Sequence, residues 1–309
     1  MTTLFISHDS FLAHDTGPHH PERPDRLRSV LKALDQASMS GLVREDAPAA
    51  TVEQMALAHP RAFVERVMAA MPTQGLRNLD PDTVVSPGSA DAVRRAAGAV
   101  VRGVDAVMDG AADNVFCAVR PPGHHAEADR AMGFCIVNNA AIGALHARAA
   151  HGLRRVAVID FDVHHGNGTQ DIFWDDPDAF YASTHQYPYY PGTGAATETG
   201  AHNNIVNVPL AAGSGSDLFR AGLTDRILPA LTAFKPDFVI ISAGFDAHRR
   251  DPLADLALRE DDFAWATAQL MDVARQTCQG RVVSALEGGY DLGALAESVV
   301  AHVQTLKDH

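Results

Sequence analysis

The sequence predicts an α/β protein built on one mainly parallel sheet that helices cover on both faces. Residues 156–159 (Val-Ala-Val-Ile) and 238–241 (Phe-Val-Ile-Ile) are apolar throughout, as parallel strands are when both of their faces are buried. Such runs alternate with helical stretches over most of the chain, which is typical of a parallel sheet. No shift in composition indicates a linker, so we expect residues 1–309 to form a single domain.

The elements follow from the same patterns. Short apolar runs indicate strands at residues 3–7, 114–119, 155–160, 179–184, 205–208, 237–242 and 281–286. The stretches between them indicate helices at residues 26–37, 90–108, 139–150, 216–234, 261–278 and 292–306. Pro21 and Pro24 precede the first of these helices. The second is rich in Ala and Val, has Asp91 near its start and is followed by Gly110.

Composition excludes several classes of partner. With 46% hydrophobic and 20% charged residues, the chain has an ordinary globular composition. We find no apolar run near the roughly 18 residues of a membrane span and no signal peptide, so we expect no membrane partner. The net charge of −13 argues against a nucleic-acid partner, which needs clustered positive charge. Three scattered cysteines cannot form a disulfide framework, which indicates a cytoplasmic location.

Polar, glycine-containing segments follow four of the predicted strands. They occupy residues 120–125, 161–168, 243–246 and 287–290, and they carry His, Asp and Tyr side chains. In open parallel sheets, ligands bind beyond the carboxyl ends of the strands. We therefore expect all four segments to share one rim and to form a functional site there.

The spacing of Asp160, Asp162 and His164 predicts a metal ion. In extended backbone these alternate side chains would lie on one side, and the two carboxylates would need a cation between them. Carboxylates with an imidazole suit Zn²⁺ or a similar divalent ion, and Asp246 is the natural third ligand beside Asp162 and His164. The alternative is a pair of buried carboxylates that accept hydrogen bonds from backbone N–H groups.

Two further motifs suit chemistry at such a rim. His124 and His125 would serve beside a metal as a general base and its partner, whereas alone they would indicate a surface turn. Tyr290 can place a phenol against a developing oxyanion, and its alternative role is an aromatic side chain that packs over a turn.

These residues resemble the class II histone deacetylase family, which includes bacterial histone deacetylase-like amidohydrolases and acetylpolyamine amidohydrolases. The resemblance covers nearly the whole chain. It rests on the motifs His-Pro-Glu-Arg-Pro at 20–24, Arg-Pro-Pro-Gly-His-His at 120–125, Gly-Phe-Cys at 133–135, Asp-Phe-Asp-Val-His-His-Gly-Asn-Gly-Thr at 160–169, Ser-Ala-Gly-Phe-Asp at 242–246 and Glu-Gly-Gly-Tyr at 287–290. It implies the arginase/deacetylase fold, with an eight-stranded parallel sheet between helices.

The resemblance also implies roles for single residues. It makes Asp162, His164 and Asp246 the ligands of Zn²⁺, with Fe²⁺ or Co²⁺ as possible substitutes. It makes His125 the general base and Tyr290 the phenol that polarises the carbonyl. His124 is the electrostatic partner of His125 and is oriented by Asp160. The implied substrate contacts are the tunnel walls Phe134 and Tyr190, Gly133 beside the scissile amide, Gly288, and Arg26 near the acetate exit path.

Members of the family also bind structural K⁺, and the resemblance implies two such sites. The first would use Asp160, the backbone of Asp162 and His164, Ser183 and Thr184. The second would use backbone oxygens near Phe173, Asp176, Ala179 and Asn204.

Two positions bear on activity and substrate. Asn167 stands where class I members carry Asp behind the second histidine, so the pKa of His125 should be lower. Leu253 aligns with a rim position at which polyamine-selective relatives carry Glu. This chain therefore has no acidic residue at that position to bind a cationic substrate.

We therefore expect a zinc-dependent amidohydrolase that removes acetyl groups from acetyl-lysine in peptides or from small acylated amines, and that could form a homo-oligomer. The first rival is an acetylpolyamine deacetylase, which Leu253 does not exclude. A dinuclear manganese ureohydrolase would need additional bridging carboxylates beside Asp246. A catalytically silent acyl-lysine binding module would usually lack the tyrosine or a ligand, whereas Tyr290 and the ligand candidates are present.

Overall fold

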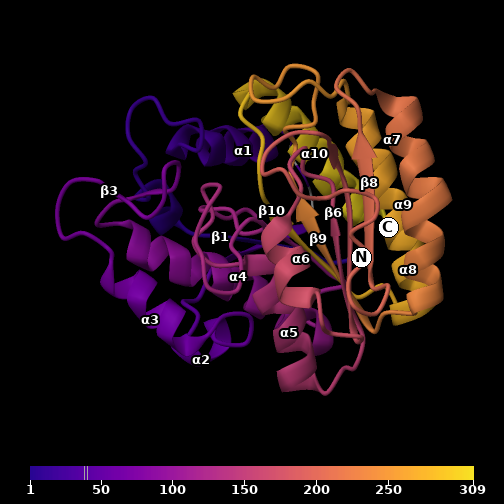
Figure 1. Cartoon of the computed structure of the whole chain (residues 1–309), viewed down its shortest axis with the longest axis horizontal. Coiled ribbons are helices and arrows are strands. Elements are labelled where there is room, and N and C mark those ends of the chain that lie inside the picture. The colour runs from indigo at the N-terminus through magenta and orange to yellow at the C-terminus, as the bar shows by residue number, and fades with distance from the viewer. Residues whose placement is uncertain (38, 40) are drawn as a thin grey trace.

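Eight parallel strands form the central sheet of the computed structural model, which describes residues 1–37, 39 and 41–309 (Figure 1). Every neighbouring pair in this sheet is parallel. The spatial order is β2 (Leu42–Asp46), β1 (Thr3–Ser7), β5 (Asn114–Cys117), β10 (Val282–Leu286), β9 (Phe238–Ala243), β6 (Val156–Asp160), β7 (Ala179–Gln186) and β8 (Ile205–Leu210). The predicted α/β class and its eight-stranded parallel sheet are confirmed.

Helices cover the sheet in two layers (Figure 1). Alternating side chains of β5 contact both layers. Val115 packs against Gly103 of α4 (Ser89–Met108), whereas the next residue, Phe116, packs against His302 of α10 (Leu292–Asp308). Next to α4 lies α5 (Asn139–His151), and α10 contacts α1 (Pro24–Gln36) and α9 (Glu260–Cys278). The remaining helices are α2 (Val52–Met55), α3 (Arg61–Ala69), α6 (Asn167–Phe173), α7 (Ser216–Gly222) and α8 (Leu228–Phe234).

Local sequence signals set the helix ends. Pro24 occupies the first turn of α1, where a missing N–H costs nothing. The side chain of Asn138 caps α5 by accepting a hydrogen bond from Ala141 N, and Gly152 ends that helix with a φ of 67°. Asp291 caps α10 in the same way through Ala294 N.

The predicted helix at 216–234 is present but is not uniform, because a π-helical turn at Leu223–Ile227 lies between α7 and α8. The sequence patterns did not predict β2, α2, α3, α6 or the antiparallel pair of β3 (Arg77–Asn78) and β4 (Val84–Val85). The strand β2 has the sequence Leu-Val-Arg-Glu-Asp and lies at the sheet edge, so it lacks the apolar run that marks a central strand.

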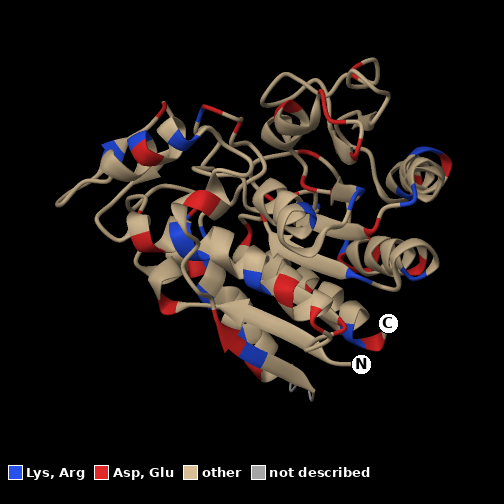
Figure 2. Ribbon diagram, turned by 90° about the horizontal axis from the view of Figure 1, so that it is seen from below, with Lys and Arg blue, Asp and Glu red and all other residues tan. Residues whose placement is uncertain are grey.

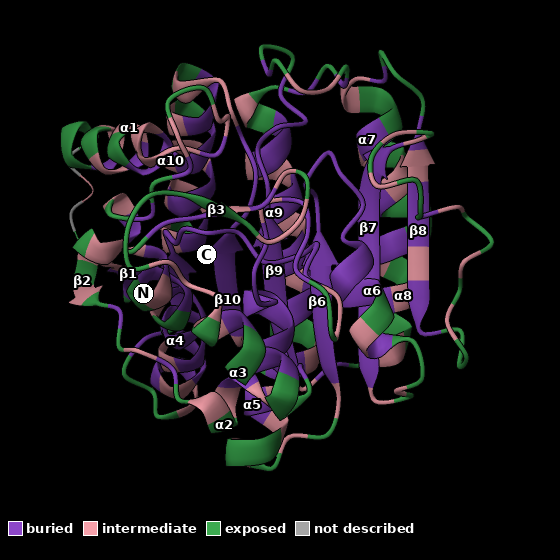
Figure 3. Ribbon diagram, turned by 60° about the vertical axis from the view of Figure 1, so that its left-hand side comes forward, coloured by how far each residue is buried: buried purple, intermediate pink, exposed green. Residues whose placement is uncertain are grey.

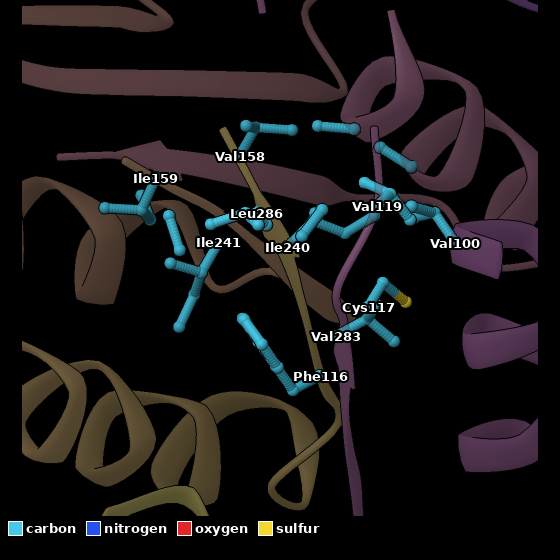
Figure 4. Close-up of a cluster of buried hydrophobic side chains, with 14 of the residues drawn as sticks. Val100, Phe116, Cys117, Val119, Val158, Ile159, Ile240, Ile241, Val283 and Leu286 are labelled. Carbon is cyan, nitrogen blue, oxygen red and sulfur yellow. The ribbon is translucent and has the colours of Figure 1, made fainter. Parts of the chain in front are cut away.

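The core lies on both sides of the central strands. Side chains of Val158, Ile240, Val283 and Leu286 pack together there, and Val100 of α4 reaches the same cluster (Figure 4). The central strands are buried, while exposed residues lie on outer helices, on loops and on the edge strand β2 (Figure 3). Charged residues of both signs are mixed over those outer helices and loops (Figure 2). Within the described part of the chain, no helix is both long and apolar enough to span a bilayer.

The strand order explains where a site can form. The four segments singled out above follow β5, β10, β9 and β6, and these strands are consecutive neighbours in the sheet. Because all four are parallel, their carboxyl ends meet at one edge, as ligand sites in such sheets require.

Candidate active site

Asp162, His164 and Asp246 form a buried group beyond the ends of β6 and β9. One ligand atom from each residue lies within 4.8 Å of the other two. The Nδ1 atom of His164 lies 3.2 Å from Asp162 Oδ1 and 3.2 Å from Asp246 Oδ2. The structure thus brings together the three residues expected to bind Zn²⁺.

Backbone groups and glycines hold the two carboxylates in place. Gly288 N donates to Asp162 Oδ2 at 2.8 Å, and Val163 N donates to Asp246 Oδ1 at 2.8 Å. A Cβ atom on Gly244 or Gly288 would come within 2.0 Å of one of these carboxylates. Gly288 was expected to contact substrate, but the structure places it behind the carboxylates, where its small size lets Asp162 and Asp246 approach each other.

The electrostatics of this group favour a cation. Burial and the neighbouring charge of Asp162 raise the pKa of Asp246 to about 7. Burial disfavours a charged His164, but its hydrogen bonds to the two carboxylates prevail and raise its pKa to about 10. A proton on His164 therefore supplies the positive charge that the carboxylates need, and a divalent ion would displace it. The donor set of two carboxylates and one imidazole fits Zn²⁺.

Asp160 does not point at this group, contrary to the expectation from its spacing. The strand β6 ends at Asp160, so the alternation of extended backbone does not continue to residue 164. Asp160 Oδ1 accepts a hydrogen bond from Asp162 N at 3.0 Å, and Oδ2 lies 2.9 Å from His124 Nδ1. Tyr181 also donates to Oδ2, at 3.1 Å. Asp160 is therefore placed to orient His124.

The two adjacent histidines have opposite tendencies to bind a proton. Burial disfavours a charged His124, but Asp160 and Asp162 outweigh this effect and raise its pKa to about 10. Burial, together with the charges of His124 and His164, holds the pKa of His125 well below its usual range. At neutral pH, His125 is thus free to accept a proton beside a positively charged His124.

Asn167 lies behind His125 as expected, and a carboxylate that the sequence analysis missed lies behind Asn167. Asn167 Oδ1 is 2.8 Å from His125 Nδ1, and its Nδ2 donates to Glu127 Oε1 at 2.7 Å. Glu127 also binds Arg130 at 2.8 Å. Glu127 lies two residues after His125 in sequence, but nothing in that pattern shows which way its side chain turns.

A pocket of about 220 Å³ lies above the metal-ligand candidates. It is lined by the expected residues His125, Gly133, Phe134, His164, Tyr190, Leu253 and Tyr290, and by Asp82 and Tyr189, which the sequence analysis did not single out. The additional carboxylate, Asp82, comes from the segment beside β4 and accepts a hydrogen bond from Gly133 N at 3.0 Å.

Aromatic rings form much of the pocket wall. Phe134 has a φ of 67° after Gly133 at 59°, and this left-handed pair turns the chain directly against His125. The ring centroids of Phe134 and Tyr290 are 5.9 Å apart, and those of Tyr190 and His125 are 5.2 Å apart. Burial raises the pKa of Tyr290 well above its usual range, so its phenol remains a hydrogen-bond donor.

Arg26 is fully buried and its donors are engaged, and its expected position near the acetate exit path stays a prediction. Its Nε donates to Gly289 O at 2.6 Å, and its Nη2 donates to Glu287 O at 2.5 Å. The guanidinium lies 5.0 Å from the ring centroid of Tyr290. Arg26 is not among the pocket-lining residues, so its visible role is to position the segment that carries Tyr290.

Glu22, from the His-Pro-Glu-Arg-Pro motif, holds Arg26 in turn. It accepts a hydrogen bond from Arg26 at 3.0 Å and two from Arg120, at 2.5 and 2.6 Å. Burial opposes its negative charge, but these arginines prevail and lower the pKa of Glu22 to about 2.

The residues implied for a first K⁺ site lie close to one another. Asp160 and Ser183 are directly paired across β6 and β7. The hydroxyl of Thr184 is buried and has no hydrogen-bond partner among the described residues, so this region has an oxygen available to a cation. K⁺ at this position stays a prediction.

The second K⁺ site does not fit the arrangement found. The carbonyl oxygens of Phe173, Asp176 and Ala179 do converge, but on the side-chain nitrogen of Asn204, which donates to them at 2.8, 3.1 and 2.8 Å. An amide N–H₂ group cannot ligate a cation, and it occupies the place among the oxygens that a cation would need.

Fold and site together define an α/β protein with a candidate metal centre beneath an aromatic pocket at the carboxyl edge of its sheet. The sequence profile of the histone deacetylase domain matches residues 20–306. The chain therefore belongs to the histone deacetylase family, and its relatives support a deacetylase or amidohydrolase function.

Named relatives and a solved structure agree with this assignment. A histone deacetylase-like amidohydrolase of Pseudomonas aeruginosa is 37% identical over 93% of this chain and 81% of its own. The chloroplastic histone deacetylase 10 of rice is 39% identical over 91% and 68%. A probable deacetylase of Archaeoglobus fulgidus is 36% identical over 96% and 83%. The crystal structure of the HDA15 HD domain superposes with a TM-score of 0.92 at 37% identity and covers 99% of this chain and 89% of that one.

Proposed function

We propose that the protein is a zinc-dependent deacetylase that hydrolyses the acetyl amide of acetyl-lysine. The observation that carries this proposal is the position of the Asp162, His164 and Asp246 group directly beneath a narrow aromatic pocket. The pocket suits an uncharged aliphatic chain, such as the stem of lysine, that places its terminal amide at the group.

The surrounding side chains have the properties that amide hydrolysis needs. A divalent ion bound by the three ligands would supply Lewis acidity to the scissile carbonyl and the attacking water. His125, whose pKa is low, accepts the proton of that water, and Asn167 keeps its imidazole oriented. Tyr290 donates a hydrogen bond to the carbonyl oxygen as negative charge develops there. The positive charge of His124, which lies beside His125, favours the negative charge that develops in the reaction.

An acetylpolyamine substrate is the second candidate, and Asp82 is the observation that favours it. Leu253 on the pocket wall offers no partner to an ammonium group, whose desolvation is costly. The carboxylate of Asp82 lines the same pocket, however, and could bind either the ammonium group of a cationic chain or the N–H group of a peptide.

A turnover comparison separates the two substrate classes. We expect kcat/KM for an acetyl-lysine peptide to exceed that for acetylspermidine, because Leu253 offers no partner to the additional ammonium group. The comparison is made at low and at high salt, since the net charge of −13 attracts any cation at low salt. Leu253→Glu should shift the ratio toward acetylspermidine by roughly 5- to 150-fold, about 1–3 kcal/mol. Leu253→Gln is the uncharged control of similar size. A wild-type preference for acetylspermidine that persists at high salt would assign the protein to the polyamine deacetylases.

A further inference from the structure

A second group of metal-ligand side chains lies between α4 and α5, outside the pocket and the motifs discussed so far. Asp105 comes from α4, and His146 and His151 come from α5. The Nε2 atoms of both histidines lie 2.8 Å from the same oxygen, Asp105 Oδ1. One ligand atom from each residue lies within 4.8 Å of the other two, which is the same limit that the Asp162, His164 and Asp246 group meets.

The chemistry of these donors suits a borderline divalent ion. Two imidazoles and one carboxylate are a common ligand set for Zn²⁺, which takes such ligands at about 2.0–2.2 Å. Ligand atoms already this close need only small side-chain movements to surround an ion. The site is also accessible, because the side chain of Asp105 is 34% exposed and that of His151 is 18% exposed. A water molecule can therefore complete the coordination from solvent.

The surroundings leave the charge of Asp105 available. The nearest arginine on α4, Arg102, is engaged by both oxygens of Glu45, at 2.6 and 3.0 Å. Arg148 on α5 is paired with Asp176. His151 is the last residue of α5, where the partial negative charge of the helix end favours a cation.

We propose that Asp105, His146 and His151 form a second divalent-metal site of the Zn²⁺ class that fastens α4 to α5. This site is separate from the candidate active site. The helix α5 begins at Asn139, whose side chain donates to Pro121 O near the catalytic histidines, and His151 lies at its opposite end, about 20 Å away. The proposal therefore does not depend on the proposed function.

Metal stoichiometry tests the proposal directly. Chelator-treated full-length protein is titrated with ZnCl₂ and followed by calorimetry and by metal analysis after gel filtration. We expect the wild type to bind two ions and His151→Gln to bind one. The matched control is His202→Gln, which changes an exposed histidine outside both groups and should still bind two. Loss of a ligand should weaken this site by at least the roughly 10- to 100-fold that loss of an outer partner causes.

Two further variants make each result decisive. Asp105→Asn keeps the shape of the side chain and should abolish the same binding event, so a folding defect in one variant does not decide the outcome. Asp246→Ala removes only the candidate active-site ligand and should retain the Asp105 site, with one ion bound. A wild type that binds a single ion, lost in Asp246→Ala and kept in His151→Gln, would show that Asp105 merely accepts hydrogen bonds from two histidines and would overturn the proposal.

Discussion

His125 shows how single residues set the chemistry of this site. Its low pKa comes from burial and from the charges of His124 and His164. The hydrogen bond that His125 Nδ1 donates to Asn167 Oδ1 opposes them and raises the pKa. The expected difference between Asn and Asp at position 167 stays a prediction, because the main causes of the low pKa are burial and the distances to two other histidines, which no motif contains.

Variants of Tyr290 and His125 separate chemistry from metal binding. Tyr290→Phe keeps the packing against Phe134 and removes the phenol, so kcat should fall by roughly 10²–10³, the cost of one oxyanion donor. His125→Ala should cost as much or more, because it removes the proton acceptor. Steady-state kinetics with metal analysis checks both, and the metal content should stay at the wild-type level. Turnover close to that of the wild type in either variant would contradict the role given to that residue.

Residue identity was more predictable from sequence than residue orientation. The metal-ligand candidates Asp162, His164 and Asp246 were expected to lie together and do so, because each follows a strand that ends at the same edge. The predicted orientation of the Asp160 side chain was wrong, because the strand β6 ends at that residue. Asp82 was not predicted, because it does not follow a strand of the main sheet and its segment reaches the pocket from outside that sheet.

Among the elements, the connection between α6 and β7 depends on a side chain from the residue before β8. Asn204 holds three carbonyl oxygens of this connection, so a neutral amide links α6, β7 and β8. Three of the four backbone oxygens that the family resemblance implied, those of Phe173, Asp176 and Ala179, do converge, whereas Asn204 O accepts a hydrogen bond from Tyr181 N. The resemblance could not show that the side chain of Asn204 fills their centre, because it concerned backbone oxygens only.

Replacement of Asn204 should expose this dependence. Asn204→Ala removes the side-chain donor shared by three carbonyl groups, of which those of Phe173 and Asp176 keep a backbone donor at 3.2 Å, and we expect a loss of about 1–3 kcal/mol in the free energy of unfolding. Because vacant carbonyls can ligate K⁺, KCl should restore the melting temperature of the variant more than that of the wild type. Thermal unfolding in KCl and in choline chloride of equal ionic strength measures both. An equal response of the two proteins to K⁺ would refute this account of Asn204.

At the scale of the whole molecule, buried histidines couple stability to pH. His302 packs among Phe116, Phe161 and Phe245 between α10 and the sheet. Burial lowers its pKa to about 3. The unfolded chain binds this proton near the ordinary value of 6.5, so the neutral histidine contributes full stability above about pH 6.5. That contribution is lost progressively as the pH falls from 6.5 toward 3.

The variant His302→Met tests this coupling. It should be less stable than the wild type at pH 7.5, because the hydroxyls of Thr267 and Ser284 lose their hydrogen bonds to His302. Its free energy of unfolding should nevertheless fall less steeply between pH 6.5 and 4 than that of the wild type. Urea unfolding at several pH values gives both slopes, and parallel pH profiles would show that His302 does not contribute.

The class of fold was predictable from apolar runs and their alternation with helices, but the order of strands was not. Apolar periodicity reports which residues are buried and says nothing about which strand lies beside which. The adjacency of β5, β10, β9 and β6 is therefore a property of the folded chain alone.

That order has a consequence for synthesis on the ribosome. The last strand made, β10, lies in the middle of the sheet and pairs with β5 on one side and β9 on the other. Until β10 emerges, the nascent chain holds two separate half-sheets, β2-β1-β5 and β9-β6-β7-β8, that have no strand in common. His125 belongs to the first half, the three metal-ligand candidates belong to the second, and Tyr290 follows β10 itself. A chain that stalls before this strand carries every ligand and both histidines, yet it cannot assemble a working centre.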